Sequence, residues 1–518
     1  MIPRSAAAWC ALWLAAGAVY ADDESPTFAE KSQGFEKDIT RLEAIDASYP
    51  PALLAHLNYA AFLIANRDED CVKRLDLAES HRASVAANVA TALLLPDGPA
   101  RVTGMESEIA SGRAFCADND QAAKDRWLPV ARENAAAAIP LYRAIHDYVS
   151  MAVAQYNLAF ADHSLGNAEL ASQELREALV TDERYGFRED AEYNYRKLHE
   201  WEKHPVTDVQ VAEYLNSFAG RYAQMTFAWV PASGTAIQHI RTDKLTNGRS
   251  GHGTMESQSS FDIARSGDDF LLSSSATSIK TDFGAADKNP GLDARLSAAL
   301  TQVYSDSPKV MIGRTGQFKG LQDGEAFRQT LIGRLKELPE KLAPPGDPDL
   351  AAIKQRIEPM LQAMQSTDYL ASLLRTNYSI ETGMWIGATL IQHRRLQFTM
   401  AMTMPGTPNG FLIHTVRFEL AGWVPCESAM ERPKCVELLI DAEPEEDSLR
   451  RARESFSKTG NGDITYWSNT RIALVVDPDT LSYYGRETRT YAYLAVKKGA
   501  QRDVEISAQV RDDRPTYR

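Results

Sequence analysis

Apolar residues recur at helical spacing through the first part of the chain. From Asp22 to about His204, a segment rich in Ala, Leu, Glu and Arg, they return every three or four positions. This period places them on one face of a helix. Clear cases lie at 58–63, 137–145 and 152–185. The pattern predicts a domain built only of helices over residues 22–204, and the His204-Pro205 junction marks its end.

The pattern changes after Gly220, where Thr, Ser, Phe and Ile become frequent and partly alternate. Alternation with a period of two is typical of strands with one buried face. Asn247-Gly248 and Ser266–Asp269 are predicted turns. Pro405–Gly410 is the strongest hairpin turn. Predicted strands lie at 225–230, 235–242, 254–264, 269–279, 309–319, 388–404, 411–423, 436–440, 471–476, 488–496 and 504–510.

One stretch, residues 323–376, returns to helical spacing inside the strand-rich part. Its apolar stripes include Leu331, Leu335 and Leu338. Stripes of this kind must be buried against a surface. We therefore expect a helical insert that acts as a lid or plug on the concave face of the sheet.

The predicted class is α+β: an N-terminal all-α helical-repeat domain, then a curved antiparallel β-sheet domain, residues 205–518, with the helical insertion 323–376. Strands on both sides of a helical insert favour a strongly bent sheet or half-barrel. This architecture is similar to that of the periplasmic lipoprotein carriers, and the similarity implies a lipid-like ligand in the β domain.

The clearest helical unit is the 34-residue segment Ala152–Tyr185. Leu158 and Ala159 fit a first helix, Leu165-Gly166-Asn167 a tight turn, and Ala171, Leu175 and Ala178 the inner face of a second helix. Here the chain resembles a tetratricopeptide repeat. The resemblance implies a concave surface for a protein or peptide partner. The alternative is a helical brace that only supports the other domain.

The N-terminus has the build of a secretory signal peptide. Arg4 precedes an apolar core from Ala6 to Val19, and Val19-Tyr20-Ala21 fits a cleavage site. We expect residues 1–21 to be removed and the protein to be secreted, in a periplasm. The alternative is an anchor that stays attached.

Four cysteines follow this segment, and four allow three pairings. Cys426 and Cys435 are close in sequence, which favours a local bridge and leaves Cys71 to pair with Cys116. The alternative is reduced, buried thiols.

The chain is acidic, with a formal net charge of −14 and no basic block. Such a chain lacks the electrostatic footprint that nucleic acids or anionic head groups require. After the N-terminus, no apolar run of 18 residues suggests a transmembrane segment.

None of the candidate catalytic or metal-binding motifs has the residue spacing that its chemistry requires. Ser455-x-x-Lys458 and Lys458-Thr-Gly460 overlap at one lysine, so they cannot face each other across a cleft. Asp287–Asp293 begins like a calcium loop, but position 12 is Ala298. Histidines 239, 252, 393 and 414 form no metal-ligand spacing. We therefore predict no catalytic residue, metal or cofactor.

Two remaining features are an acidic run and a set of aromatic residues. The run Asp441–Asp447 is interpreted as a solvated turn before a helix. The aromatic residues lie on or near the long hairpin and belong to the core or, if the sheet encloses a cavity, to a ligand site: Trp385, Phe398, Phe411, Phe418 and Trp423.

These patterns predict an exported, non-enzymatic envelope protein that binds a protein partner or a lipid-like ligand. Two alternatives remain open at the level of sequence. One is an envelope hydrolase with an unrecognised site, and the other is a structural scaffold subunit.

Overall fold

The computed structural model divides the chain into two compact units after Tyr222. The α+β class is confirmed, with helices in the first unit and an antiparallel sheet with inserted helices in the second. The structure describes residues 26–66, 70–88, 95, 97–117, 120–219, 224–231, 234–247, 253–282, 292–343, 346, 350–392, 394–403, 411–426, 435–458, 463–498 and 501–517. The predicted signal peptide, residues 1–21, lies outside these residues.

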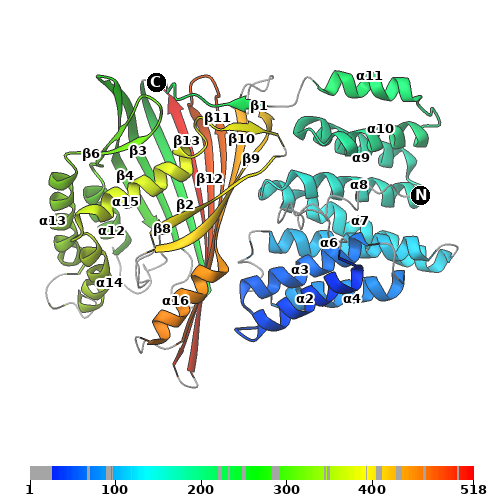
Figure 1. Ribbon diagram of the computed structural model, residues 1–518, viewed down its shortest axis with the longest axis horizontal. Coiled ribbons are helices and arrows are strands. Elements are labelled where there is room, and N and C mark those ends of the chain that lie inside the picture. The colour runs from blue at the N-terminus through cyan, green and yellow to red at the C-terminus, as the bar shows by residue number, and fades with distance from the viewer. Residues whose placement is uncertain are drawn as a thin grey trace. The chain divides into compact units, whose positions relative to one another are not determined.

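In the first unit, consecutive helices pack side by side (Figure 1). They are α2 (Phe28–Glu43), α3 (Pro50–Ala65), α4 (Cys71–Ala86), α6 (Gly98–Cys116), α7 (Gln121–Ala144), α8 (Tyr148–Ser164), α9 (Ala168–Tyr185), α10 (Arg188–Trp201) and α11 (Asp208–Ala219).

The predicted hairpin of residues 152–185 forms as α8 and α9. Gly166 has a φ of +88°, a left-handed conformation that glycine adopts without strain, and it turns the chain between the two helices. Ala171, Leu175 and Ala178 are fully buried on the inner face of α9. The small side chains of Ala171 and Ala178 allow the helices to approach closely. The hydrophobic stripe of the sequence is therefore the packing face of α9.

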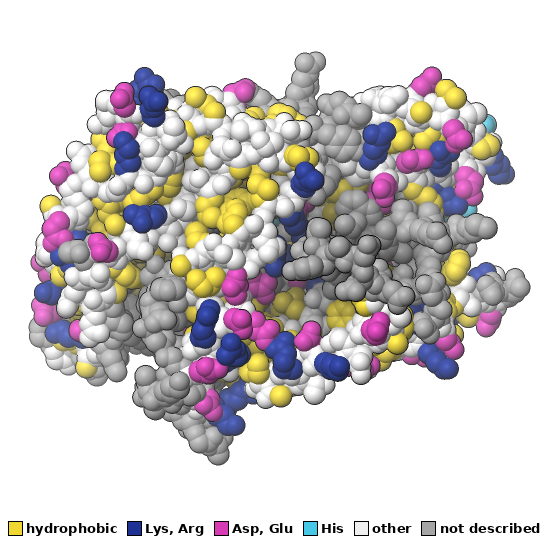
Figure 2. Space-filling model, viewed as in Figure 1, with side chains coloured by type: hydrophobic (Ala, Val, Ile, Leu, Met, Phe, Trp, Pro, Cys, Tyr) yellow, Lys and Arg dark blue, Asp and Glu magenta, His cyan; other side chains and the backbone are white. Residues whose placement is uncertain are grey.

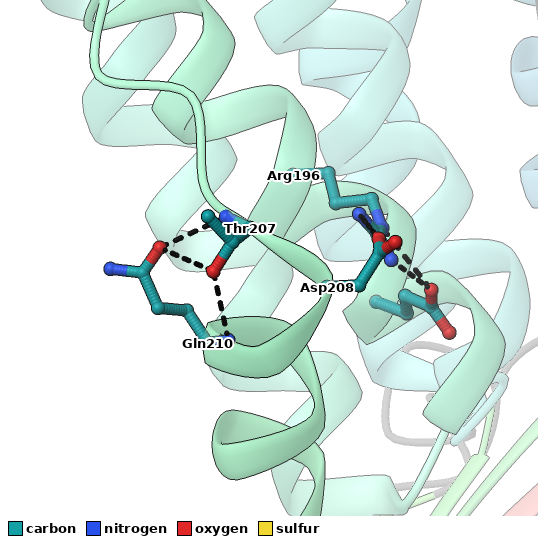
Figure 3. A network of polar contacts seen from close by, with 5 residues as sticks. Arg196, Thr207, Asp208 and Gln210 are labelled. Atoms are coloured by element: carbon teal, nitrogen blue, oxygen red, sulfur yellow. Dashed lines mark hydrogen bonds and ion pairs between the residues drawn. The ribbon is translucent and has the colours of Figure 1, made fainter.

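Helix α11 belongs to the first unit, although sequence analysis placed the domain boundary before it. Tyr214 of α11 stacks on Tyr195 of α10, with ring centroids 4.1 Å apart. Figure 3 shows a capping box at its start, where Gln210 N donates to Thr207 Oγ1 and Thr207 N donates to Gln210 Oε1. The capping box defines the start of α11 beyond Pro205, and the tyrosine stack holds the helix on α10.

The second unit contains an eleven-stranded antiparallel sheet among the described residues, ordered β6-β5-β4-β3-β2-β13-β12-β11-β10-β9-β8. Its strands are β2 (Gly234–Asn247), β3 (Gly253–Ser266), β4 (Asp269–Asp282), β5 (Lys309–Ile312), β6 (Phe318–Gln322), β8 (Leu396–Thr403), β9 (Phe411–Val424), β10 (Cys435–Pro444), β11 (Asp463–Val476), β12 (Tyr483–Lys498) and β13 (Gln501–Tyr517). β1 (Gln224–Thr226) and β7 (Thr389–Ile391) form a separate pair.

Most of the sheet consists of long strands. Two segments that were each predicted as one strand are divided into two strands in the structure. Residues 388–404 form β7 and β8 instead of one strand, and 309–319 forms β5 and part of β6 around a turn at Gly316. The predicted turn at Ser266–Asp269 joins β3 to β4. The turns predicted at Asn247-Gly248 and Pro405–Gly410 lie at or beyond the limits of the described residues.

The sheet is strongly bent, because one helix contacts both of its terminal strands. Helix α15 (Thr367–Tyr378) packs against β6 and against β8. A twelve-residue helix is about 18 Å long, whereas eleven flat strands would extend over roughly 48 Å. The terminal strands therefore curve toward each other, as Figure 1 also shows. The predicted curved sheet is observed, with α15 lying across its mouth.

The helices around α15 bury their leucines mainly against one another. α12 (Leu292–Val303), α13 (Gly324–Leu342), α14 (Leu350–Ala363) and α15 share one apolar cluster. Leu331, Leu335 and Leu338 lie in it. The prediction that these leucines cover the concave face is wrong, because α12 and the other inserted helices supply the apolar surface that they need.

The outer edge of β4 is covered by side chains and backbone at and after α12. Ser274 N donates to Ser307 Oγ at 2.8 Å, Ile279 N to Thr301 Oγ1 at 2.9 Å, and Thr281 N to Ser297 Oγ at 2.9 Å. Edge strands expose unpaired backbone groups that invite pairing with other chains. Here hydroxyl oxygens accept those hydrogen bonds in place of a strand.

Candidate functional site

A cavity of about 410 Å³ opens in the helical unit. Its walls come from α4, α6, α8 and α10, together with the end of α3 and one residue of α9. This volume lies in the range of pockets that hold a small molecule or a few side chains of a bound chain. The helical stack thus offers a pocket that is partly open to solvent.

One wall of the cavity is fixed by a disulfide and a buried arginine. Cys71, the first residue of α4, is bonded to Cys116, the last residue of α6, with their Cα atoms 6.2 Å apart. Arg74 is buried and donates to the carbonyls of Leu63 and Ile64 at the end of α3. These links hold three helices together. The second bridge predicted from sequence, Cys426–Cys435, is also present, so both pairings are confirmed.

Three carboxyl groups line the cavity, and burial raises the pKa of each. Desolvation raises the pKa of Glu108 to about 7, although the Arg101 guanidinium opposes the shift. Burial, assisted by the charge of Glu189, raises the pKa of Asp190 to about 6. The pKa of Asp182 is raised well above its ordinary value, first by burial and then by the charge of Asp190. Burial is thus the first cause of the raised pKa at all three carboxyl groups.

Three side-chain oxygens of residues that line the cavity have no hydrogen-bond partner in the protein: Ser111 Oγ, Asp182 Oδ1 and Asn194 Oδ1. Asn194 Nδ2 donates to Asp182 Oδ2 at 2.7 Å, which leaves Asp182 Oδ1 and Asn194 Oδ1 without partners. Asp182 is fully buried and Asn194 is 3% exposed. Buried polar groups are nearly always hydrogen-bonded, so these acceptors require a donor from water or a ligand.

Aromatic side chains complete the cavity. The hydroxyls of Tyr156 and Tyr193 lie 2.8 Å apart, and their rings meet edge to face. Phe160 joins them from α8, and Phe115, at the end of α6, is 49% exposed. Apolar surface beside unpaired acceptors is the composition expected of a binding pocket.

The structure places most of the sequence-predicted ligand aromatics in the core of the sheet unit. Trp385 and Phe418 are 2% and 1% exposed and belong to one cluster with Phe227. Phe398 and Trp423 are partly buried and pack against that cluster. Phe411 pairs through its backbone with Thr403, and its side chain lies outside what the structure describes. Phe398, Phe418 and Trp423 lie on one face of the bent sheet, and Trp385 packs against that face.

That inner face combines two apolar regions with a polar centre. The first region is the cluster around Phe418, and the second surrounds Trp229, Phe270 and Ile312. Between them, buried Asp513 accepts from Arg486 at 2.7 Å and from the Tyr483 hydroxyl at 3.3 Å. Figure 2 shows apolar side chains gathered around α15 on the visible face of this unit.

The acidic run Asp441–Asp447 was interpreted from sequence as a solvated turn, and this is wrong for its first half. Asp441 and Glu443 lie on β10, and α16 (Glu446–Lys458) begins after them. Asn469 donates to Asp441 at 2.7 Å, and the Trp467 indole donates to Glu443 at 3.2 Å. Cross-strand partners allow these carboxylates to occupy a strand.

The other motifs are not brought together. Among the described histidines, His414 is buried on β9 and His239 is exposed on β2, whereas His252, His393 and the start of the calcium-like loop lie outside the described residues. Within the part of the chain that the structure describes, no group of three His, Cys, Asp or Glu side chains is arranged to hold a metal ion. None of the described helices combines the length and apolar character needed to cross a membrane.

A histidine pair in the helical unit was not singled out by sequence analysis. His56 Nδ1 lies 2.8 Å from His81 Nδ1, and His56 Nε2 lies 3.1 Å from Glu43 Oε1. A neutral His56 donates from Nε2 to the carboxylate, so its Nδ1 accepts from His81. Burial, followed by the charge of His56, lowers the pKa of His81 to about 4.

Comparisons with known proteins leave the chain without a family. No family model matches it, and no curated protein matches it. Among solved structures, it is similar to one titled "Lipid-protein interactions in lipovitellin", with 8% identity and a TM-score of 0.25. The match covers 55% of this chain and 25% of that one. At this level the likeness supports no statement about fold or ligand.

Proposed function

We propose that this protein is a non-enzymatic binding protein of an oxidising compartment, whose helical unit captures an extended segment of a partner protein. The single observation that carries the proposal is the cavity lined mainly by α4, α6, α8 and α10. Its open acceptors and aromatic rim offer both hydrogen bonds and apolar contact to a bound chain.

The resemblance of residues 152–185 to a tetratricopeptide repeat fits this proposal. Such stacks present an extended concave surface to a partner. Here α6, α8 and α10 line the cavity, while α7 and α11 contribute no lining residue. Two disulfides support the expectation of export into a periplasm, because such bridges persist in oxidising compartments.

The proposal is tested by placing a photo-crosslinking amino acid at Phe115, on the rim of the cavity. We expect a discrete crosslinked protein, which mass spectrometry maps to one short segment. The matched control is the same amino acid at Leu141, which is 36% exposed and outside the cavity lining. Equal crosslinking from both positions, or none from Phe115, would rule out capture by this cavity.

A second candidate function, favoured by the bent sheet, is binding of a lipid-like ligand along its inner face. α15 crosses the mouth of that sheet, and the apolar side chains Phe398, Met400 and Met402 there are only partly buried. Native mass spectrometry of protein purified from its own compartment tests this candidate. We expect a bound mass that lipid extraction removes; protein of unmodified mass that takes up no lipid from vesicles would exclude it.

A further inference from the structure

The cavity of the helical unit demands a hydrogen-bond donor. Asp182 Oδ1 and Asn194 Oδ1 are buried acceptors without a protein partner, and both residues line the cavity. Leaving a buried acceptor unpaired costs about 1–3 kcal/mol. An occupant that carries several N–H groups can donate to both oxygens, whereas an occupant with only acceptors leaves the amide oxygen of Asn194 unpaired.

The cavity also carries an excess of negative charge. Its lining contains the carboxyl groups of Glu108, Asp182 and Asp190 and the guanidinium of Arg74. Arg74 already donates to two backbone carbonyls. Outside the lining, Arg101 acts on Glu108, but Glu183 and Asp190 add negative charge near Asp182. Buried carboxylates are stabilised by a cation, so the occupant is expected to be positive.

The remaining walls suit the stem of such a cation. Tyr156, Phe160 and Phe115 present aromatic surface to the same space. Aromatic faces attract ammonium and guanidinium groups and also pack against methylene groups. A carboxylate or phosphate would instead meet three carboxyl groups, and an acyl chain would leave both open acceptors unpaired.

We propose that this cavity binds an organic cation, an ammonium or guanidinium group on an apolar stem. In a bound partner segment, which rests on the proposed function above, the group is supplied by a lysine or arginine side chain. Asp182 and Asn194 accept its hydrogen bonds, Glu108 and Asp190 balance its charge, and the aromatic rings contact its stem.

The test is isothermal titration calorimetry of the full, oxidised chain at pH 8. This pH lies above the pKa values of Glu108 and Asp190, so both carboxyl groups are ionised. The probes are an acetylated Gly-Ser-Phe-Arg-Phe-Ser-Gly amide, the same peptide with Gln in place of Arg, and agmatine as a free guanidinium. We expect the Arg peptide to bind roughly tenfold to a hundredfold more tightly than the Gln peptide.

Binding of a cation at pH 6.5, between the raised pKa values of Asp190 and Glu108, should also release protons, because it lowers those pKa values. Titrations at that pH in imidazole and in phosphate, which differ in ionisation enthalpy, measure this release. The variants Asp182→Asn and Glu108→Gln should each weaken the preference for Arg. Glu133→Gln is the matched control, since Glu133 is exposed on α7 and does not line the cavity. Thermal unfolding checks that each variant folds.

The outcomes separate the two proposals. Equal binding of both peptides would overturn the cation inference and leave peptide capture intact. In a second outcome, agmatine binds, neither peptide binds, and the Asp182→Asn variant loses agmatine binding. This outcome would support the cation site and contradict capture of a peptide. Failure of all three probes, with only water at Asp182 in a crystal soaked with agmatine, would overturn the inference.

Discussion

Two fully buried aspartates, one in each unit, differ in their charged neighbours. In the sheet unit, fully buried Asp513 accepts a hydrogen bond from the Arg486 guanidinium at 2.7 Å across neighbouring strands. In the helical unit, equally buried Asp182 has an amide for a partner and another carboxylate, Asp190, as its charged neighbour. A buried carboxylate that is paired with a cation has a structural role. A buried carboxyl group without a cationic partner marks a position where a ligand is expected to bind.

The largest effect is expected from breaking the paired charge. Asp513→Asn should destabilise the sheet unit by about 3–5 kcal/mol, because it leaves the Arg486 guanidinium buried without its counter-charge. Urea unfolding followed by far-UV circular dichroism measures the loss. Glu505→Gln, an exposed change on the same strand β13, is the control and should alter stability by less than about 0.5 kcal/mol. Similar losses in both variants would contradict a special role for the pair.

The disulfides provide the next comparison between the units. Cys71–Cys116 closes a loop of sequence separation 45, and Cys426–Cys435 one of 9. Loop-closure entropy predicts losses of about 4 and about 2.6 kcal/mol when each pair is replaced by serine. Only the first replacement should also weaken binding at the cavity, since that bridge joins α4 to α6. Equal losses, measured by thermal unfolding, would show that loop length does not control these bridges.

Removing the carboxyl group of Glu108 should have the opposite effect on stability to removing that of Asp513, although burial raises the pKa of both groups. The pKa of Glu108 is raised to about 7 in the folded state, so the folded chain holds a proton that the unfolded chain has released between about pH 4.5 and 7. Stability is therefore lost as the pH rises through this window. Glu108→Gln should stabilise the helical unit by about 1–3 kcal/mol at pH 8 and have little effect at pH 4. A destabilised variant at pH 8 would argue that the carboxylate already has a cation.

The smallest of these effects concerns the histidine pair. The pKa of His81 is lowered to about 4, so the unfolded chain binds the proton first as the pH falls below about 6.5. Its contribution to stability is complete above that pH and decreases toward pH 4. His81→Phe should flatten this part of the stability profile by about 1–2 kcal/mol. Unfolding at pH 7 and pH 4.5, compared with the parent chain, checks it; an unchanged slope would assign the pH dependence to other groups.

Sequence periodicity predicted the two-part fold well and its details less well. The alternation of Phe261 and Ile263 with polar neighbours identified strand β3, because a half-buried strand imposes that pattern. It could not show that Leu331 and Leu335 pack on α12, since an apolar stripe does not specify its partner. Asp441 and Glu443 were placed in a turn because the strand neighbours that pair with them are far along the chain.

The helical cavity was missed, although a signal was present. The buried stripe of α9 runs through Ala171, Leu175 and Ala178 and continues to Asp182, a charged residue in an apolar position. A charge on the inner stripe of a helix indicates a polar site or a structural pair. Periodicity alone does not distinguish them, because the choice depends on whether another helix brings a cation to that point.

The covering of β4 by α12 has a consequence for assembly. A foreign strand could pair with this edge only after displacing the hydroxyls of Ser297, Thr301 and Ser307 from backbone donors that are already bonded. Domain swapping or fibril growth through this side therefore requires α12 to detach first. Docking of α12 therefore protects the edge of β4 during folding. In a folding intermediate without docked α12, the backbone donors of β4 are exposed and can pair with a strand of another chain.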